Sequence, residues 1–212
     1  MLGGDVVFRL LGVMFGFKFS MKDDINQLVK RCRPKMKAIL RRRYVYPTQE
    51  LIKQYKTHIW SVIEYHSASI YHATVISLQP LDNLHYSYIR DLGISAEEAF
   101  LLYNFPPAKL RRDIGMLGCL HKRVLGRSHP SFAKLFPFKA SHDHGRHSRQ
   151  LETYSDTTFF QEMLWKRSLF ALAGVYNTLP QHVVDLPSIS DFQTWLTHQA
   201  KHKCSTSVQN WY

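Results

Sequence analysis

The chain has 212 residues, enough for one domain with room for a small second lobe. Hydrophobic residues make up 45% of it and aromatic residues 13%, which excludes an intrinsically disordered chain. The formal net charge of +12 favours a polyanionic partner, either nucleic acid or an acidic membrane surface. Most of the excess lies in residues 21–43, with nine basic and two acidic residues, and in residues 106–150, with ten and two.

The cysteines and the apolar N-terminal stretch bear on where the protein works. Cys32, Cys119 and Cys204 are widely spaced, so they form neither a disulfide framework nor a CxxC metal motif. Reduced thiols are typical of the nucleus and the cytoplasm, and we expect the protein in one of these compartments. Residues 1–19 lack the basic start and the cleavage site of a signal peptide. No segment reaches the roughly 18–20 apolar residues of a transmembrane helix, so we expect no membrane partner.

Hydrophobic periodicity predicts the elements of the N-terminal half. Residues 5–19 predict one or two short β-strands. Residues 23–43 predict a helix with an apolar face, and Pro34 predicts a kink in it or two abutting helices. A new helix is expected to begin near Pro47 and to run to about His72.

Capping signals predict the helices that follow. A helix from about Pro80 to Leu92 would end at Gly93, and "SAEE" at residues 95–98 is a capping box that opens a short helix. The stretch "LRRDIGMLGCLHKRVLG", residues 110–126, predicts an amphipathic helix with His121 on its apolar side.

The C-terminal part begins with a polar stretch. Residues 139–157 lack any period, so we expect a linker or loop there. Helices are expected over residues 159–177 and 190–202, with Ser190 as the N-cap of the second.

These elements predict a mainly α fold, a helical bundle with one or two short N-terminal β-strands and a small C-terminal helical unit. The expected divisions are strands in residues 1–20, a helical domain in 21–137, a linker in 138–157, a C-terminal helical unit in 158–204 and a tail in 205–212.

Two basic stretches are candidate phosphate-binding surfaces. Eight of the fourteen positions 30–43 are Lys or Arg with no Glu among them, although like charges four residues apart on a helix repel. A solvated helix face or a nuclear localisation signal is the alternative for this stretch. The second basic stretch lies within residues 110–126, and the alternative for it is close packing against another helix through Gly115 and Cys119. The candidate residues are Lys30, Arg31, Arg33, Lys35, Lys37, Arg41, Arg42, Arg43, Arg111, Arg112, Lys122 and Arg123.

The sequence predicts no catalytic residue, no metal and no cofactor. Near-ligand spacing occurs in two groups, namely His142, His144 and His147, and His198, His202 and Cys204. A polar loop is favoured for the first group, and the second lacks a partner cysteine. Four tyrosines, Tyr65, Tyr71, Tyr86 and Tyr88, could stack on bases, but packing is their commoner role.

An ordered set of segments is similar to a known family. The segments are "FRLLGVMFGFKFSMKDDINQLVKRCRPKMKAILRRR", "LIKQYKTHIWSVIEYHSASIYHA", "LDNLHYSYIRDLGI", "PPAKLRRDIGMLGCLHKRVLGRSHPSFAKLFP" and "SLFALAGVYNTLP". They resemble, in this order, the region after the palm of non-LTR (LINE-like) retrotransposon reverse transcriptases. The resemblance covers about residues 8–200 and implies the edge of the palm in residues 1–20, a helical thumb in residues 21–137 and a downstream tail.

The resemblance also implies a role. The family's metal-binding carboxylates lie upstream in the palm, and "MKDD" at residues 21–24 has Met21 where the catalytic turn has an aromatic residue. The chain would therefore be a non-catalytic C-terminal fragment of an RNA-directed DNA polymerase. Its expected partners are the backbone of an RNA/DNA template–primer duplex and the upstream palm and fingers. The alternatives are an inert or protein-interacting helical remnant of a mobile element, or a metal-dependent nuclease that uses the histidine-rich loop.

Overall fold

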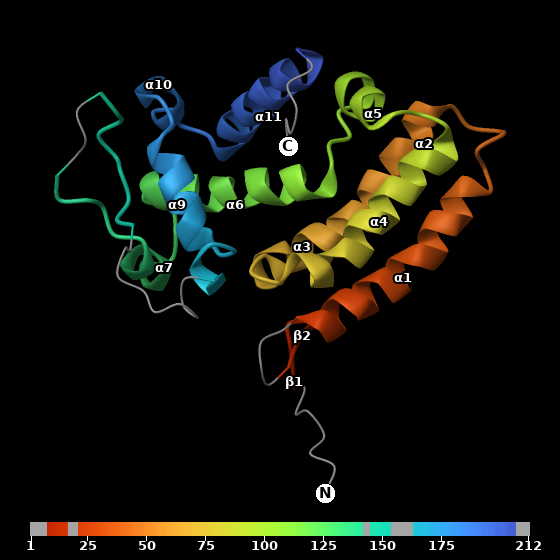
Figure 1. The fold of residues 1–212 in the computed structure, drawn as a ribbon, viewed down its shortest axis with the longest axis horizontal. Helices are drawn as coiled ribbons and strands as arrows, with labels where there is room; N and C mark the ends of the chain where they lie inside the picture. Colours follow the sequence, from red (N-terminus) through yellow and green to blue (C-terminus); the bar gives the residue numbers. More distant parts are fainter. Residues whose placement is uncertain (1–7, 17–20, 142–144, 154–162, 207–212) are drawn as a thin grey trace, which may run out of the picture. The chain divides into compact units, whose positions relative to one another are not determined.

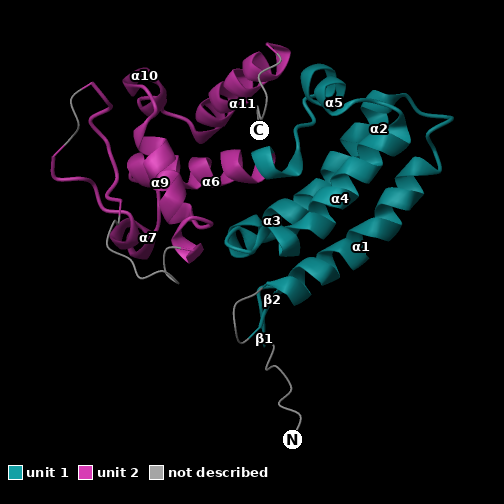
Figure 2. Ribbon diagram, in the orientation of Figure 1, with its two compact units in different colours: residues 1–110, 212 teal, residues 111–211 magenta. Residues whose placement is uncertain are grey.

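Helices dominate the computed structural model, which describes residues 8–16, 21–141, 145–153 and 163–206 (Figure 1). A two-stranded antiparallel sheet precedes the helices, so the predicted fold class, a mainly α bundle with short N-terminal strands, is confirmed. The chain divides into two compact units, one up to Leu110 and one that begins at Arg111 (Figure 2). Each unit has its own hydrophobic core. No described helix combines the length and the hydrophobicity that a membrane crossing requires.

Unit 1 opens with a β-hairpin of strands β1 (Phe8–Leu10) and β2 (Val13–Phe15). The two turn residues, Leu11 and Gly12, both have positive φ angles, as a tight two-residue hairpin turn requires. The hairpin is held against the helices, because the backbone N–H of Met14 donates to Asp24 Oδ1 at 2.9 Å.

Helix α1 (Lys22–Leu40) continues through Pro34 as one helix, where two abutting helices were an alternative. Pro34 lies on the exposed side, while the buried residues continue on both of its sides and pack against α4 (Val75–Leu92). Burial of that face outweighs the backbone hydrogen bond that proline removes. The buried residues are Asp24, Ile25, Leu28, Val29, Cys32, Met36 and Ile39.

The next helical stretch follows the prediction closely. It consists of α2 (Thr48–Tyr55), a π-helical segment (Lys56–Trp60) and α3 (Ser61–Ile70). The π-helical segment was not predicted, because apolar periodicity does not distinguish one widened turn from its α-helical neighbours. The buried ring of Tyr55 lies 4.4 Å from that of Tyr88 and anchors this stretch in the core.

Helix α4 begins five residues earlier than expected. The Thr74 side chain caps it by accepting from the Ser77 backbone N–H, so Pro80 lies inside the helix instead of opening it. Gly93 ends α4 with a φ of 76°, and Ser95 caps α5 (Ala96–Tyr103), both as predicted.

Unit 2 is built from helices around a second core. They are α6 (Ala108–Val124, whose first turn falls in unit 1), α7 (Pro130–Leu135), α9 (Leu169–Asn177), α10 (Gln181–Val184) and α11 (Ile189–Ser205). The hydroxyl of Ser188, not that of Ser190, caps α11. The expected helix over residues 159–177 is described as α9 from Leu169 onward, and residues 159–162 lie outside the described residues.

The expected linker belongs partly to this core. His147 and Leu151 are fully buried, and Leu151 exchanges two hydrogen bonds with the Asn177 side chain, at 2.8 and 2.7 Å. Such isolated contacts leave no period in a polar sequence, which is why a linker was expected. The division between the units therefore falls within α6, before this stretch.

Candidate nucleic-acid interface

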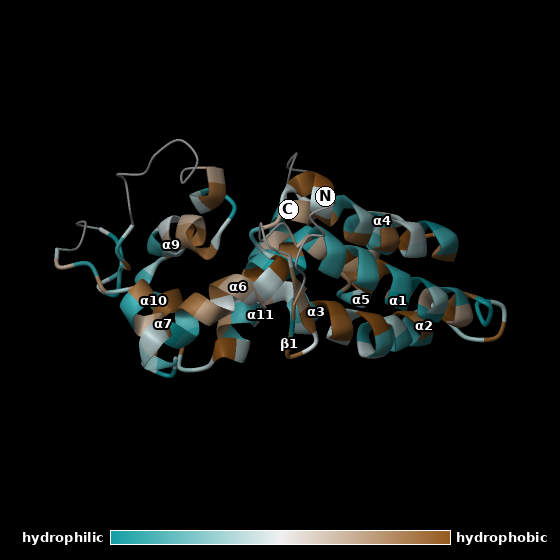
Figure 3. Cartoon of the chain, turned by 90° about the horizontal axis from the view of Figure 1, so that it is seen from below, coloured by the Kyte–Doolittle hydropathy of each residue, from teal (hydrophilic) through white to brown (hydrophobic). Residues whose placement is uncertain are grey.

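Four of the candidate cations form a row on the outer side of α1. Lys30, Arg33, Lys37 and Arg41 follow one another at spacings of three, four and four residues, and each is exposed. This spacing places them on one stripe of the helix, roughly opposite its buried face, over about 16 Å. We call these four residues the α1 basic face; α1 is largely hydrophilic in Figure 3.

The α1 basic face is not neutralised by the protein itself. Within the described part of the chain, none of its four side chains forms a hydrogen bond or an ion pair. Neighbours at this spacing lie about 5–6 Å apart at their Cβ atoms and repel one another. An anion bound across them would relieve this repulsion.

The other cations of the first stretch are differently placed. Lys35 is half-buried, and its ammonium donates to the His58 carbonyl at 3.3 Å. Arg43 donates to the Asp91 carbonyl and to the Tyr44 hydroxyl. Arg42 is exposed at the turn, and exposed Arg31 lines a pocket described below.

The turn after α1 adds aromatic side chains that the sequence analysis missed. Tyr44 is 84% exposed and Tyr46 42%, and the Arg43 guanidinium lies 4.8 Å from the Tyr44 ring centroid. Exposed aromatic rings beside cations are typical of surfaces that hold unpaired bases. The signal was present as "RRRYVYP", an aromatic pair between a basic triplet and a proline. Of the tyrosines considered earlier, Tyr88 is buried.

The second basic stretch offers far less free charge. Arg112 is only 6% exposed and Arg111 is half-buried. Arg123 donates from Nε to the Phe136 carbonyl at 2.9 Å, and its guanidinium lies over the Phe138 ring. Lys122 is the one exposed side chain of these four. The four residues belong to unit 2, whereas the α1 basic face belongs to unit 1.

Close packing, the alternative for this stretch, occurs at a different glycine. A Cβ on Gly118 would overlap the Gln193 side chain of α11, whereas one on Gly115 would meet open space. His121 is a packed core residue, as predicted, and its ring stacks on Phe192 at 4.1 Å. Burial lowers the pKa of the His121 imidazole.

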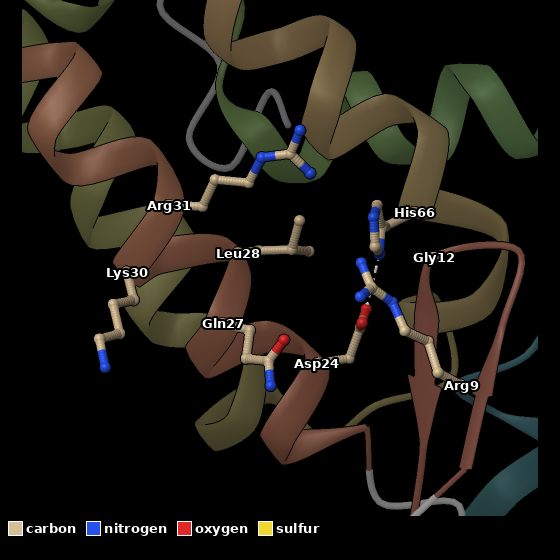
Figure 4. A pocket seen from close by; sticks show the side chains of 8 residues that line it. All are labelled: Arg9, Gly12, Asp24, Gln27, Leu28, Lys30, Arg31 and His66. Atoms are coloured by element: carbon tan, nitrogen blue, oxygen red, sulfur yellow. Dashed lines mark hydrogen bonds and ion pairs between the residues drawn. The ribbon is translucent and has the colours of Figure 1, made fainter.

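A polar pocket of about 330 Å³ lies between the hairpin and the N-terminal half of α1 (Figure 4). Asp24, 1% exposed, lies at the pocket, and its Oδ2 accepts from His66 Nδ1 at 2.8 Å. Asp24 provides a negative charge in the first turn of α1, and its two hydrogen bonds also connect α1 to the hairpin and to α3. The lining includes Arg9, Asp24, Gln27, Lys30, Arg31 and His66.

Metal coordination finds no support in the described part of the chain, which contains no group of three His, Cys, Asp or Glu side chains that could hold an ion. His142 and His144 lie outside the described residues. Cys204, from the other candidate group, is buried at the end of α11.

Comparison with known proteins identifies no relative of this chain. No protein family, curated protein or solved structure was found to match it. The function is therefore inferred from the side chains and their surroundings.

Proposed function

We propose that this protein binds the sugar–phosphate backbone of a nucleic-acid duplex, without reading the base sequence, through the α1 basic face and the adjoining Arg42. The observation that carries the proposal is the row of four exposed cations that have no partner among the described residues. Cations placed along a surface displace condensed counterions from nucleic acid, and this release drives binding that does not depend on sequence.

A merely solvated helix face explains the row less well. Cations at the C-terminal end of a helix stabilise its negative end, which accounts for Lys37 in the last turn and for Arg41 at the C-cap but not for Lys30 and Arg33. A structural face would also intersperse Glu with the cations, and α1 carries its acidic residues only in the first turn. The arrangement therefore favours an external anion.

Two further features support a nucleic acid as that anion. Tyr44 lies exposed against the Arg43 guanidinium and can stack on an unpaired base at the end of a duplex. The sequence resemblance to the thumb region of retrotransposon reverse transcriptases supports an RNA/DNA template–primer duplex as the partner. In that role the chain holds the duplex, in the nucleus or the cytoplasm, and supplies no catalytic group.

Equilibrium binding of a fluorescent RNA/DNA hybrid, followed by anisotropy at fixed salt, tests this proposal. We expect the double variant Lys37→Gln/Arg41→Gln to bind about tenfold more weakly than the wild type. The matched control is Arg127→Gln/Lys134→Gln, which removes two exposed cations from unit 2 and should bind nearly as the wild type does.

Two outcomes would contradict the proposal. If both double variants bind as tightly as the wild type, the α1 basic face is not the contact surface. If two hybrids of unrelated sequence differ strongly in affinity, recognition is not confined to the backbone.

A further inference from the structure

We propose that the pocket between the β1–β2 hairpin and α1 binds one phosphate group, held by Arg9 and Arg31 and hydrogen-bonded by His66. The basic and polar side chains that line the pocket favour a phosphate group as its ligand. That this phosphate is the terminal phosphate of a nucleic-acid strand rests on the proposed function.

The buried side of the pocket presents an imidazole nitrogen. Asp24 uses both of its carboxylate oxygens, one for the Met14 N–H and one for His66 Nδ1. His66 is 5% exposed and lines the pocket, and its Nε2 has no hydrogen-bond partner among the described residues. Nε2 is not among the buried side-chain atoms that lack a partner, so it is open to the pocket and a ligand there can reach it. Nε2 can accept from a phosphate hydroxyl or, when the ring is protonated, donate to a phosphate oxygen.

Two guanidinium groups reach the pocket from different elements. Arg9 comes from β1 and Arg31 from α1, and Figure 4 shows both extending toward His66, whereas Lys30 points away. Neither arginine side chain forms an ion pair or a hydrogen bond within the described residues. Planar guanidinium groups match pairs of phosphate oxygens, and two of them outweigh the single charge of Asp24.

Charge and size favour a terminal phosphate over an internal diester. A phosphate monoester carries about −1.5 to −2 charges at pH 7 and an internal diester only one, so the monoester gains more from two guanidinium groups. The volume of about 330 Å³ leaves room for the attached sugar. Lys30 belongs both to the pocket lining and to the α1 basic face, so a strand on that face can end in the pocket.

The test uses the full-length chain and hybrids whose strand ends carry either phosphate or hydroxyl groups. We expect the wild type to bind phosphorylated ends about tenfold more tightly than hydroxyl ends. The variant Arg9→Gln/Arg31→Gln should lose this preference while it keeps most of its affinity for hydroxyl-ended duplex. Lys37→Gln/Arg41→Gln should lose affinity for both duplexes and keep their ratio. Arg9 and Arg31 are exposed, so their replacement leaves the core intact.

A second measurement separates the pocket from the duplex. Inorganic phosphate, at constant ionic strength, should show broadened ³¹P resonances with the wild type but not with Arg9→Gln/Arg31→Gln. If the resonances broaden but the protein shows no preference for phosphorylated ends, the pocket binds free phosphate as its ligand. If the resonances broaden but no duplex binds, only the proposed function is overturned. Equal affinity for both kinds of end together with unbroadened resonances would overturn the pocket proposal.

Discussion

At the scale of single residues, the contact between Asp24 and His66 shows what a sequence can and cannot predict. The pair Asp23–Asp24 was correctly placed in the first turn of a helix, where carboxylates are favourable. The sequence does not tell which of the two is buried, because His66 lies 42 residues away and the Met14 N–H approaches from the hairpin. Burial of the carboxylate depends on those two distant partners.

Replacement of Asp24 tests this account of the hairpin's attachment. Asp24→Ala leaves His66 Nδ1 and the Met14 N–H without their acceptor, so we expect the free energy of unfolding to fall by about 3 kcal/mol. The neighbouring Asp23→Ala removes an exposed carboxylate and should cost less than about 1 kcal/mol. Urea denaturation of both variants measures the difference, and equal losses would show that the buried contact contributes no special stability.

At the scale of elements, the two basic helices show why a similar sequence pattern led to different surfaces. In α1 the apolar residues occupy one face, so the cations opposite remain in solvent. In α6 buried residues recur at Ile114, Met116, Leu117 and Leu120, which cover more than one side of the helix. Arg112 is therefore buried with them. The wider spread of apolar residues was visible in the sequence, but the neighbours that cover them were not.

The glycines of α6 provide a matched pair for testing helix packing in unit 2. Gly118→Leu forces a side chain against Gln193 of α11, so we expect the free energy of unfolding to fall by about 1–3 kcal/mol. Gly115→Ala places a methyl group in open space within the same helix and should raise it by about 0.5–1 kcal/mol through helix propensity. Thermal or urea unfolding measures the stability of both variants. If Gly118→Leu leaves the free energy of unfolding unchanged, close packing at position 118 is contradicted.

At the scale of the whole molecule, hydrophobic periodicity predicted the mainly helical fold and most of its elements. It predicted a separate C-terminal unit but placed the boundary after residue 137, because Leu110 and Arg111, where the two units divide, lie inside one continuous helix. A polar stretch suggested a boundary, yet His147 and Leu151 within it are buried in unit 2. Helix ends were predicted where capping residues were unambiguous, as at Gly93 and Ser95, and missed where nearby residues competed for the cap.

The structure shows how the basic residues behind the net charge of +12 are placed. In the second basic stretch Arg112 is buried and Arg123 is hydrogen-bonded within unit 2, whereas the four side chains of the α1 basic face are exposed and have no partner among the described residues. We propose that the exposed cations of the α1 basic face contact backbone phosphates.

The dependence of hybrid affinity on salt concentration counts these phosphate contacts and so tests this claim. Each phosphate contact contributes about −0.9 to the slope of log affinity against log salt concentration. For the α1 basic face together with Arg42 we expect a slope of roughly −4 to −5 between about 50 and 200 mM salt, less steep by about two in Lys37→Gln/Arg41→Gln. A slope that these substitutions leave unchanged, or no binding at the lowest salt, would contradict the claim.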